Sequence, residues 1–264
     1  MLLRTDGINI LFDPFFSEHY GPLRLPGLQR KVVSPVAVPQ LPTIDLVVIS
    51  HDHYDHLDRK TVEQLTRLQP RMHFVVPLGV GDTLRSWEIH QVTELDWYQT
   101  FRFKNVVLHA VPAVHESGRS LSSRNRSLWA GYVVESPSTR TYFSGDTADG
   151  PMFDDIAERL GPIDTAFIAI GAYGPERLLA QYHLAPEQAW NAGSRLHAAR
   201  VVLIHWGTMI NSAEPLHEPI ARFRKIAAGD DRLIDARAGT FVAQTSTQKL
   251  LSNQAKRRKQ SPDG

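Results

Sequence analysis

Residues 50–58 read SHDHYDHLD and follow directly on the apolar run LVVI. Three histidines and three aspartates fall within these nine positions. Side chains alternate across an extended chain, so we expect His51 and His53 to point the same way. Asp55 and His56 come just after, where the chain turns towards a helix. The segment therefore presents two pairs of candidate metal ligands to one small volume, although a solvated, charged strand end is the simpler alternative.

The composition narrows the chemistry of any metal site. The chain has 264 residues, of which 42% are hydrophobic and 22% charged, as is ordinary for a globular protein. It contains no cysteine, so disulfides and thiolate ligands are excluded, and a metal must be held by imidazole and carboxylate groups. The net charge of +1 gives no argument for a nucleic-acid partner. The 12 histidines are therefore the residues to follow.

We expect a cytoplasmic protein, because no apolar run approaches the roughly 18 residues that suggest a membrane span. The N-terminal sequence MLLRTDGINILFDP also lacks the pattern of a signal peptide. Residues 1–245 are predicted to form one domain. Residues 246–264 are polar and basic and are predicted to be a disordered tail, which leaves peripheral contact with the inner membrane face open.

Short apolar strands alternate with helical segments, which predicts two packed sheets flanked by helices. Residues 13–43 carry six prolines and little periodicity, so they are expected to form a long surface loop. Pro70 should end one helix, and Pro186 suits the first turn of another. The predicted helices cover residues 59–69, 152–160, 186–198 and 216–227. The predicted strands cover residues 1–5, 8–12, 45–50, 73–77, 101–103, 106–111, 128–136, 140–144, 165–170 and 200–205.

Two metal ions need more ligands than one segment supplies, and three further candidates follow predicted strands. His115 lies in PAVHES, Asp146 lies in SGDT, and His205 lies in IHWGT. Ligands just beyond several strands can converge in one place. Taken singly, each residue is more often structural, but together with SHDHYDHLD they make a set of seven candidate ligands.

This order of motifs resembles the metallo-β-lactamase fold, an α+β fold built as a four-layer αββα sandwich. Five segments resemble one branch of that group, the N-acyl-phosphatidylethanolamine phospholipase D branch and its bacterial relatives. They are FDPFFSEHYGP, SGRSLSSRNRSLWAGYVVE, YFSGDTADGPMF, GAYGPERLLAQYHLAPEQAW and IHWGTMINSAEPLHEP. The resemblance runs from about residue 7 to about residue 235. The His-x-His-x-Asp-His motif is specific for the fold but not for the reaction.

The resemblance implies two ligand groups joined by a bridging carboxylate. The first zinc would be bound by His51, His53 and His115, the second by Asp55, His56 and His205, and both by Asp146. Iron and manganese are alternatives for such ligands. A hydroxide between the two ions would then attack the substrate, with Asp146 and Asp55 beside it. His183, in QYHLAPE, would lie near the substrate phosphate or the leaving group, unless it is a helix-capping or surface residue.

Other residues are candidates for contact with the substrate. The segment SGRSLSSRNRS holds three arginines that either contact an anionic substrate or lie on a solvated loop, namely Arg119, Arg124 and Arg126. Tyr173 is a further candidate. An apolar groove for acyl chains is expected beside the metals, formed by the loop at 13–43, including Leu23, Leu25 and Leu28, and by the loop around Leu178. The alternative is that these apolar residues only pack the loops onto the body.

Two departures from the branch affect the interpretation. The branch often has glutamine before the third histidine ligand and an aromatic residue after it, whereas this chain has Val114 and Glu116. Glu116 brings negative charge near the place expected for a lipid phosphate. The chain also begins late, so that MLLRTDG is expected to be the remnant of a longer strand that precedes residue 8 in the branch.

The sequence thus predicts a hydrolase domain that binds two zinc ions and cleaves a phosphodiester, with a phospholipid such as N-acyl-phosphatidylethanolamine as the favoured substrate. A lactonase of the same fold is the alternative within this class of enzymes. A metal-binding or lipid-binding protein with little catalysis is the alternative from another class. We expect a small molecule or a phospholipid as the partner, with no nucleic acid, and a homodimer is left open.

Overall fold

The strands of the structure form two sheets that pack face to face. The computed structural model describes residues 1–21, 29–243 and 246. The first sheet has five strands in the order β1-β2-β3-β4-β5, with β1 antiparallel to β2 and the remaining neighbours parallel. These strands are β1 (Leu2–Thr5), β2 (Ile8–Phe12), β3 (Leu46–Val48), β4 (His73–Pro77) and β5 (Val92–Leu95).

The second sheet has seven strands in the order β12-β11-β10-β9-β8-β7-β6. Strands β9 to β12 run parallel to one another, whereas β6 to β9 form an antiparallel meander. The strands are β6 (Thr100–Phe103), β7 (Val106–Val111), β8 (Gly131–Glu135), β9 (Arg140–Phe143), β10 (Thr165–Ala169), β11 (Val201–Ile204) and β12 (Leu233–Ile234).

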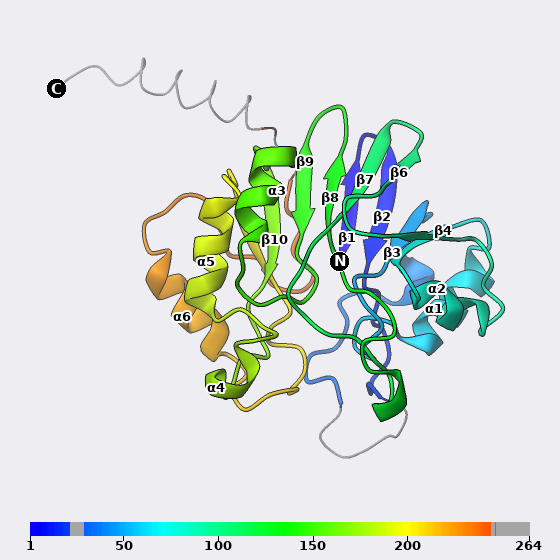
Figure 1. The fold of residues 1–264 in the computed structure, drawn as a ribbon, viewed down its shortest axis with the longest axis horizontal. Helices are drawn as coiled ribbons and strands as arrows, with labels where there is room; N and C mark the ends of the chain where they lie inside the picture. The colour runs from blue at the N-terminus through cyan, green and yellow to red at the C-terminus, as the bar shows by residue number, and fades with distance from the viewer. Residues whose placement is uncertain (22–28, 244–245, 247–264) are drawn as a thin grey trace.

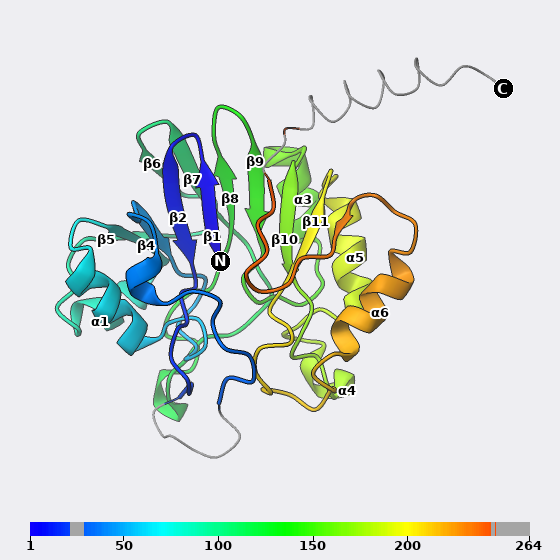
Figure 2. The same ribbon diagram turned by 180° about the vertical axis from the view of Figure 1, so that it is seen from behind.

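Helices cover the outer face of each sheet, so the molecule has four layers in the order αββα (Figure 1). The five-stranded sheet carries α1 (Arg59–Leu68) and α2 (Val80–Arg85). The seven-stranded sheet carries α3 (Met152–Leu160), α5 (Pro186–Arg195) and α6 (Glu218–Ile226), while the short α4 (Glu176–Leu179) lies below them (Figure 2). No helix of the described residues combines the length and the apolar character needed to cross a membrane.

Alternating side chains explain why the two sheets face each other. In β2, Ile10 and Phe12 point into the core between the sheets, whereas Leu11 packs with the outer helices. The seven-stranded sheet follows the same rule, since Tyr132 of β8 faces the other sheet and Val133 faces its own helices. Each sheet therefore buries both faces, as a sandwich with helices outside requires.

All ten predicted strands and all four predicted helices are present, and the four-layer fold is confirmed. Proline 186 begins α5, and α1 ends at Leu68, two residues before Pro70. The predicted bounds were too long at some ends, because β3 stops at Val48 and α5 stops at Arg195. Two short α-helices, α2 and α4, and two short strands, β5 and β12, were not predicted from the sequence.

The predicted loop at 13–43 and the predicted tail are only partly described. The described part of the loop holds a 3-10 helix at Val38–Gln40 and an isolated bridge between His19 and Gln29. Leu23, Leu25 and Leu28, which were expected to line an acyl groove, lie outside the described residues, as does nearly all of the tail at 246–264.

Candidate metal centre

The seven candidate ligands lie at one edge of the sandwich, in loops that follow strands. Residues 50–58 leave the end of β3 and lead to α1. The other loops follow β7, β9 and β11 of the second sheet. These strands run in the same direction, so their loops leave the same edge, at the lower end of the sheets in Figure 1. The packing of the two sheets therefore brings together residues that are up to 154 positions apart, His51 and His205 being the extremes.

The first group of side chains is purely imidazole, and we call it the three-histidine group. His51, His53 and His115 each offer a ring nitrogen, and the three atoms lie within 4.8 Å of one another. The His51 Nε2 atom is 2.9 Å from His53 Nδ1, and the His115 Nε2 atom is 3.3 Å from the same nitrogen. His51 and His115 are buried, so the group is largely shielded from solvent.

The second group mixes imidazole with carboxylate, and we call it the Asp55 group. Asp55, His56 and His205 offer ligand atoms within 4.8 Å of one another. Asp146 lies between the two groups. Its Oδ2 atom is 3.2 Å from His56 Nε2 and 3.4 Å from His205 Nε2, and it also shares a potential metal-ligand group with His51.

The carboxylate of Asp13 fixes two of the imidazoles, and the sequence analysis missed this role. Asp13 Oδ2 accepts a hydrogen bond of 2.7 Å from His56 Nδ1 and another of 2.6 Å from the Ser50 hydroxyl. Since that hydroxyl donates to Asp13, it accepts from His51 Nδ1 at 2.9 Å. One carboxylate thus sets the tautomer of both His51 and His56, and directs each Nε2 lone pair into the centre.

The sequence carried a signal for Asp13 that follows from the sheet. Phe12 of β2 pairs with Val48 of β3 in parallel register, so Asp13 and Ser50 leave neighbouring strands at the same edge. Asp13 stands directly after a strand, as Asp146 nearly does. A search for carboxylates immediately beyond the predicted strands would therefore have included it.

His115 and His205 are held by backbone contacts from loops distant in sequence. His115 Nδ1 donates to the Tyr182 carbonyl oxygen at 2.9 Å, which leaves its Nε2 for the three-histidine group. His205 has a positive φ of 57°, and a side chain at Gly171 would lie only 2.1 Å from its carbonyl oxygen. Glycine at 171 therefore permits the close approach of two loops that places His205.

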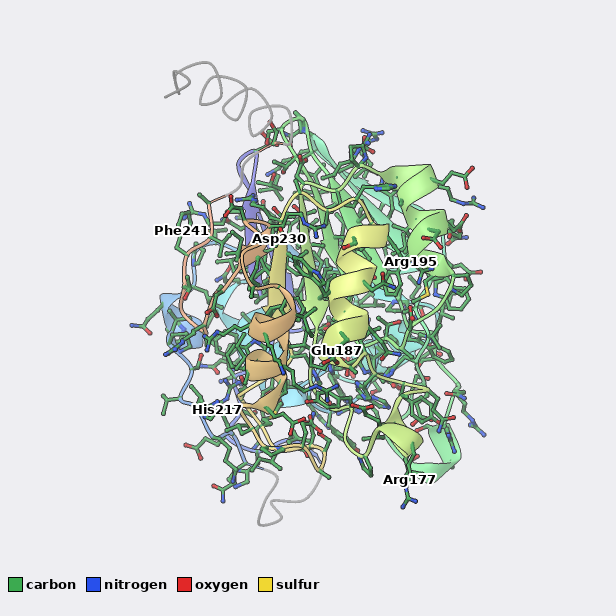
Figure 3. The ribbon with its side chains drawn as sticks, turned by 90° about the vertical axis from the view of Figure 1, so that its left-hand side faces the viewer. Arg177, Glu187, Arg195, His217, Asp230 and Phe241 are labelled. Carbon is green, nitrogen blue, oxygen red and sulfur yellow. The ribbon has the colours of Figure 1, made fainter. Side chains whose placement is uncertain are left out.

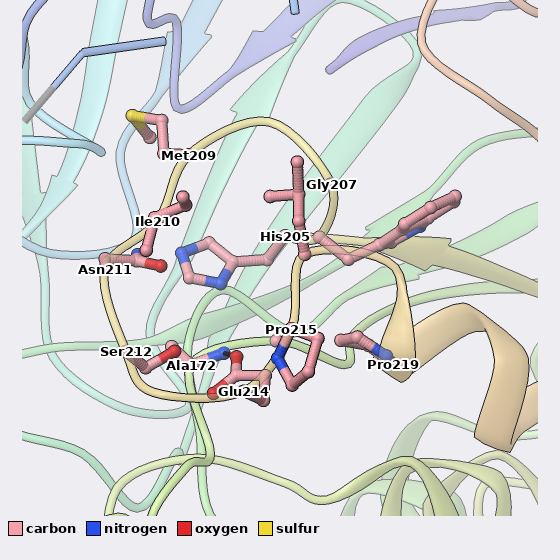
Figure 4. A pocket seen from close by; sticks show the side chains of 13 residues that line it. Ala172, His205, Gly207, Met209, Ile210, Asn211, Ser212, Glu214, Pro215 and Pro219 are labelled. Carbon is pink, nitrogen blue, oxygen red and sulfur yellow. Dashed lines mark hydrogen bonds between the residues drawn. The ribbon is translucent and has the colours of Figure 1, made fainter. Parts of the chain in front are cut away.

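A second carboxylate closes the loop that carries His205. Glu214 accepts hydrogen bonds from the backbone N–H groups of Ala172, at 2.7 Å, and Gly174, at 2.8 Å. His205, Ala172 and Glu214 line one small cavity, which Figure 4 shows from close by. Glu214 thus fastens the loop after β11 to the loop after β10. It was also missed, because nothing in the local sequence indicates this long-range contact.

The donor set fits a pair of metal ions. With Nδ1 of His51, His56 and His115 already donating outwards, the Nε2 atom of each neutral ring carries a lone pair that faces another ring nitrogen at 2.9–3.3 Å. Such contacts are repulsive unless a cation or a proton lies between them. The Asp146 Oδ1 atom is moreover buried without a hydrogen-bond partner, although buried carboxylates are normally paired. Cations at this edge would satisfy both conditions.

The two groups differ in charge. Burial lowers the pKa of His51 well below its ordinary value and that of His115 to about 3, which keeps both rings neutral. Burial also opposes a charged His56, but Asp146, Asp55 and Asp13 outweigh it and raise the pKa of that imidazole well above its ordinary value. The pKa of His205 is raised in the same way, against burial, by Asp146 and Asp55.

The carboxylates respond in the opposite direction. Burial alone would raise the pKa of Asp146 and Asp55, but the neighbouring imidazoles of His205 and His56 lower both pKa values below the ordinary range. Both groups are therefore ionised near neutral pH. This arrangement matches what cation binding needs, because carboxylate ligands must be deprotonated.

The predicted geometry of the segment at 50–58 is largely found, although the segment is a turn rather than a strand. His51 and His53 converge, as predicted. Asp52 points away and accepts a hydrogen bond of 2.6 Å from Gly118 N, and the Tyr54 hydroxyl donates to the Arg119 carbonyl oxygen. Their role is to hold this segment against the loop after β7.

His183 lies beside the candidate metal centre, and its contact with the substrate stays a prediction. Its Nδ1 atom is 3.8 Å from Asp146 Oδ2, and it shares a potential ligand group with His115 and Asp146. Burial lowers the pKa of His183, so that its ring is neutral near pH 7. It follows α4 and is placed by the same segment that supplies the Tyr182 carbonyl oxygen for His115.

The residues predicted to contact the substrate are occupied with protein partners. The Arg119 guanidinium donates to the carbonyl oxygens of Asp52 and Leu57, both at 2.8 Å, and lies over the Tyr54 ring. Arg124 is exposed and pairs with Glu116 at 2.7 Å, which compensates the negative charge that made Glu116 unusual. Tyr173 is buried and donates to Glu218 at 2.9 Å. Their contact with substrate stays a prediction, and Arg126 is exposed.

Comparison with known proteins identifies the family. Residues 8–206 match the model of the β-lactamase superfamily domain. The chain belongs to this superfamily. It is 33% identical over 246 residues to N-acyl-phosphatidylethanolamine-hydrolyzing phospholipase D 1 of Caenorhabditis elegans, covering 89% of this chain and 69% of that protein. An uncharacterized protein of Mycobacterium tuberculosis is 42% identical over 226 residues, which are 84% of this chain but only 60% of the relative's length.

A solved structure of another hydrolase shares the fold. The isothiocyanate hydrolase from Delia radicum gut bacteria superposes with a TM-score of 0.71 at 19% sequence identity, covering 93% of this chain and 95% of that one. At this identity the likeness concerns the fold alone. The superfamily and the histidine and aspartate clusters are together consistent with a dinuclear metal site, as the sequence predicted, and the identity of the metal is a separate question.

Proposed function

We propose that this protein is a metal-dependent hydrolase that cleaves phosphodiesters, with a phospholipid as the favoured substrate and N-acyl-phosphatidylethanolamine as the example that the similarity to the C. elegans enzyme offers. The observation that carries the proposal is the shared position of Asp146, which lies within 3.4 Å of imidazoles from the Asp55 group and also joins a potential ligand group with His51. The similarity to the C. elegans phospholipase D supports the phosphodiester as the bond that is cleaved.

Each candidate ligand has a proposed place. The three-histidine group would hold one ion, the Asp55 group would hold the other, and Asp146 would contact both. Zinc is the favoured metal, because neutral imidazoles and carboxylates without thiolates are suitable zinc ligands, and iron or manganese are the alternatives. When bound, two divalent ions supply Lewis-acid charge next to the phosphoryl oxygens and lower the pKa of water.

The protein's own contribution is to fix the orientation of the imidazole rings, and the ring nitrogen that carries the proton, before the substrate binds. Asp13 holds one proton of His56 on Nδ1 and, through Ser50, that of His51, so a metal ion meets the free Nε2 lone pair of His51 and has to displace only the second proton of His56, on Nε2. The Tyr182 carbonyl oxygen does the same for His115. This network costs no rearrangement during the reaction, which is the advantage of a preorganised site.

His183 is proposed to act on the substrate rather than to hold metal. Its Nδ1 atom is buried and makes no hydrogen bond, and its distance of 3.8 Å from Asp146 exceeds a hydrogen bond. A ring N–H at this place can donate to a phosphoryl oxygen or to the leaving oxygen as negative charge develops there. The ionised Asp146 would help to keep that proton on the ring.

The test compares substrates on one protein sample. Protein stripped with a chelator and then reconstituted with zinc is assayed on bis(p-nitrophenyl) phosphate, N-acyl-phosphatidylethanolamine and a simple lactone. We expect both phosphodiesters to be cleaved only after reconstitution. The Asp231→Ala variant, which changes an exposed aspartate, serves as the control and should match the unmodified chain. Brisk lactone hydrolysis without phosphodiester cleavage would favour a lactonase, and metal binding without any hydrolysis would favour a binding protein.

A further inference from the structure

A cavity of about 350 Å³ opens next to the candidate metal centre, between α4, α5 and α6. Its size falls within the range of about 300–1,000 Å³ that is usual for small-molecule sites. His183 is the residue that joins the two regions, because it lines the cavity and also shares a potential ligand group with His115 and Asp146. A substrate whose phosphate lies at the centre can therefore extend one of its ester groups into this space.

The far wall of the cavity is built around Arg222 of α6. Its guanidinium contacts a glutamate on each of the three helices, with distances of 2.9 Å to Glu176 of α4, 2.6 Å to Glu187 of α5 and 3.4 Å to Glu218 of α6. Figure 3 shows Glu187 at the end of α5 that faces α4 and the beginning of α6. The guanidinium also lies over the Tyr173 ring at 4.9 Å from the ring centre.

The charge of this wall is negative, although its most prominent residue is an arginine. Three carboxylates surround one guanidinium, which leaves a formal charge of −2. Arg222 is largely occupied, because four hydrogen bonds run from its Nε and both terminal nitrogens to carboxylate oxygens. The hydrogen bond to Glu187 above all holds the pKa of Arg222 above its ordinary value. The wall therefore repels an anionic ligand and attracts a cationic one.

We propose that this cavity receives the alcohol part of the phosphodiester and selects an amino alcohol that carries a positive charge, such as an ethanolamine or choline group. The inference rests on the proposed function, since it assigns the head-group side of the same site. The ammonium would lie near Glu176 and Glu187, which line the cavity, while the ester oxygen would lie near His183. An N-acylated head group is neutral and would lose this attraction, so a lipid such as N-acyl-phosphatidylethanolamine would still be cleaved, but more slowly than the same lipid with a free amine.

The experiment uses two short-chain phospholipids that differ only in the charge of the head group, dihexanoyl-phosphatidylethanolamine and its N-acetyl derivative. For the zinc-reconstituted enzyme we expect kcat/KM to be about tenfold higher for the charged lipid, as one partly screened charge interaction allows. The Glu187→Gln variant should bring the ratio close to one, chiefly through a fall in kcat/KM for the charged lipid. The Glu158→Gln variant, which removes an exposed carboxylate on α3, is the matched control and should keep the ratio.

A binding measurement separates failure of this inference from failure of the proposed function. Choline chloride is titrated into ¹⁵N-labelled protein, and we expect saturable shifts of the amides of Ala180 and Gln188, which line the cavity. The shifts should weaken in the Glu187→Gln variant and persist in Glu158→Gln. Two results would overturn the inference. One is the absence of saturable shifts. The other is faster cleavage of the N-acetyl lipid than of the charged lipid, with a ratio of the two kcat/KM values that Glu187→Gln does not change. Choline binding without any phosphodiester cleavage would overturn the proposed function alone.

Discussion

The three-histidine group is held by neutral contacts, whereas the Asp55 group is held by charge. His51 donates a hydrogen bond to a serine hydroxyl and His115 donates one to a backbone carbonyl oxygen. Burial lowers the pKa of both rings and keeps them uncharged. In the Asp55 group, His56 and His205 face the carboxylates of Asp55 and Asp146, which raise the pKa of both imidazoles. The second group therefore binds protons in competition with metal, and the first does not. Two metal positions that share Asp146 should thus differ in affinity and in their response to pH.

Substitution of Asp146 tests what the two groups share and should have the largest effect. The Asp146→Ala variant removes the carboxylate that both positions use, so we expect loss of metal from both and a fall in hydrolysis of about 10³-fold or more. The His183→Ala variant should keep both metals and lower kcat. Metal analysis and kinetics on the same samples check the division of roles. Equal metal loss in the two variants would show that His183 is a ligand.

Substitution of Asp13 tests the support beneath the ligands. In Asp13→Asn the side chain can no longer accept from both His56 and Ser50 with full charge, and we expect metal affinity to fall about 10- to 100-fold. The loss should be greater at the Asp55 group, because His56 bonds to Asp13 directly and His51 does so through Ser50. Competition with a chromophoric chelator measures the two affinities. An unchanged Asp55 position would contradict the role given to Asp13.

Acidification should distinguish the two groups without any mutation. A ligand must lose its proton to bind metal, so a raised pKa makes protons compete already near neutral pH, and a lowered pKa postpones that competition. Lowering the pH from about 8 to about 6 should weaken the ion at His56 and His205 and leave the ion at His51 and His115 in place. Metal content after dialysis across this range checks the order. Loss of both ions in one step would contradict the difference between the groups.

Substitution of Arg119 should change the difference between the two groups least, because this residue supports the segment at 50–58, which carries ligands of both groups. Its two carbonyl partners and its stacking on Tyr54 suit a planar guanidinium, so Arg119→Lys should cost about 1–3 kcal/mol of stability. Denaturant unfolding measures the cost. The ratio of the two metal affinities should stay constant, and so should the KM for anionic substrates. A selective rise in KM would instead support the contact between Arg119 and the substrate that was predicted from the sequence.

The sequence predicted the regular parts of the fold and the candidate ligands that stand at strand ends, because both leave a local pattern. Apolar runs mark the strands, and His115, Asp146 and His205 each follow one. β5 was missed because three of its four residues, VTEL, are half-buried and two are polar, and β12 because it has only two residues. Asp13 was detectable as a carboxylate directly after a strand, but its contact with His56, like that of Glu214 with Ala172, could not be predicted from local pattern. They depend on parallel register and on loops that meet only when the sheets pack.

The central claim is that the chain holds two metal ions that share Asp146, and metal stoichiometry tests it most directly. Metal-free protein is dialysed to equilibrium against zinc, and protein-bound metal is measured per chain. We predict about two ions per chain, with one lost before the other as the free zinc concentration is reduced. A plateau at one ion or fewer, in folded protein and at saturating zinc, would contradict the account.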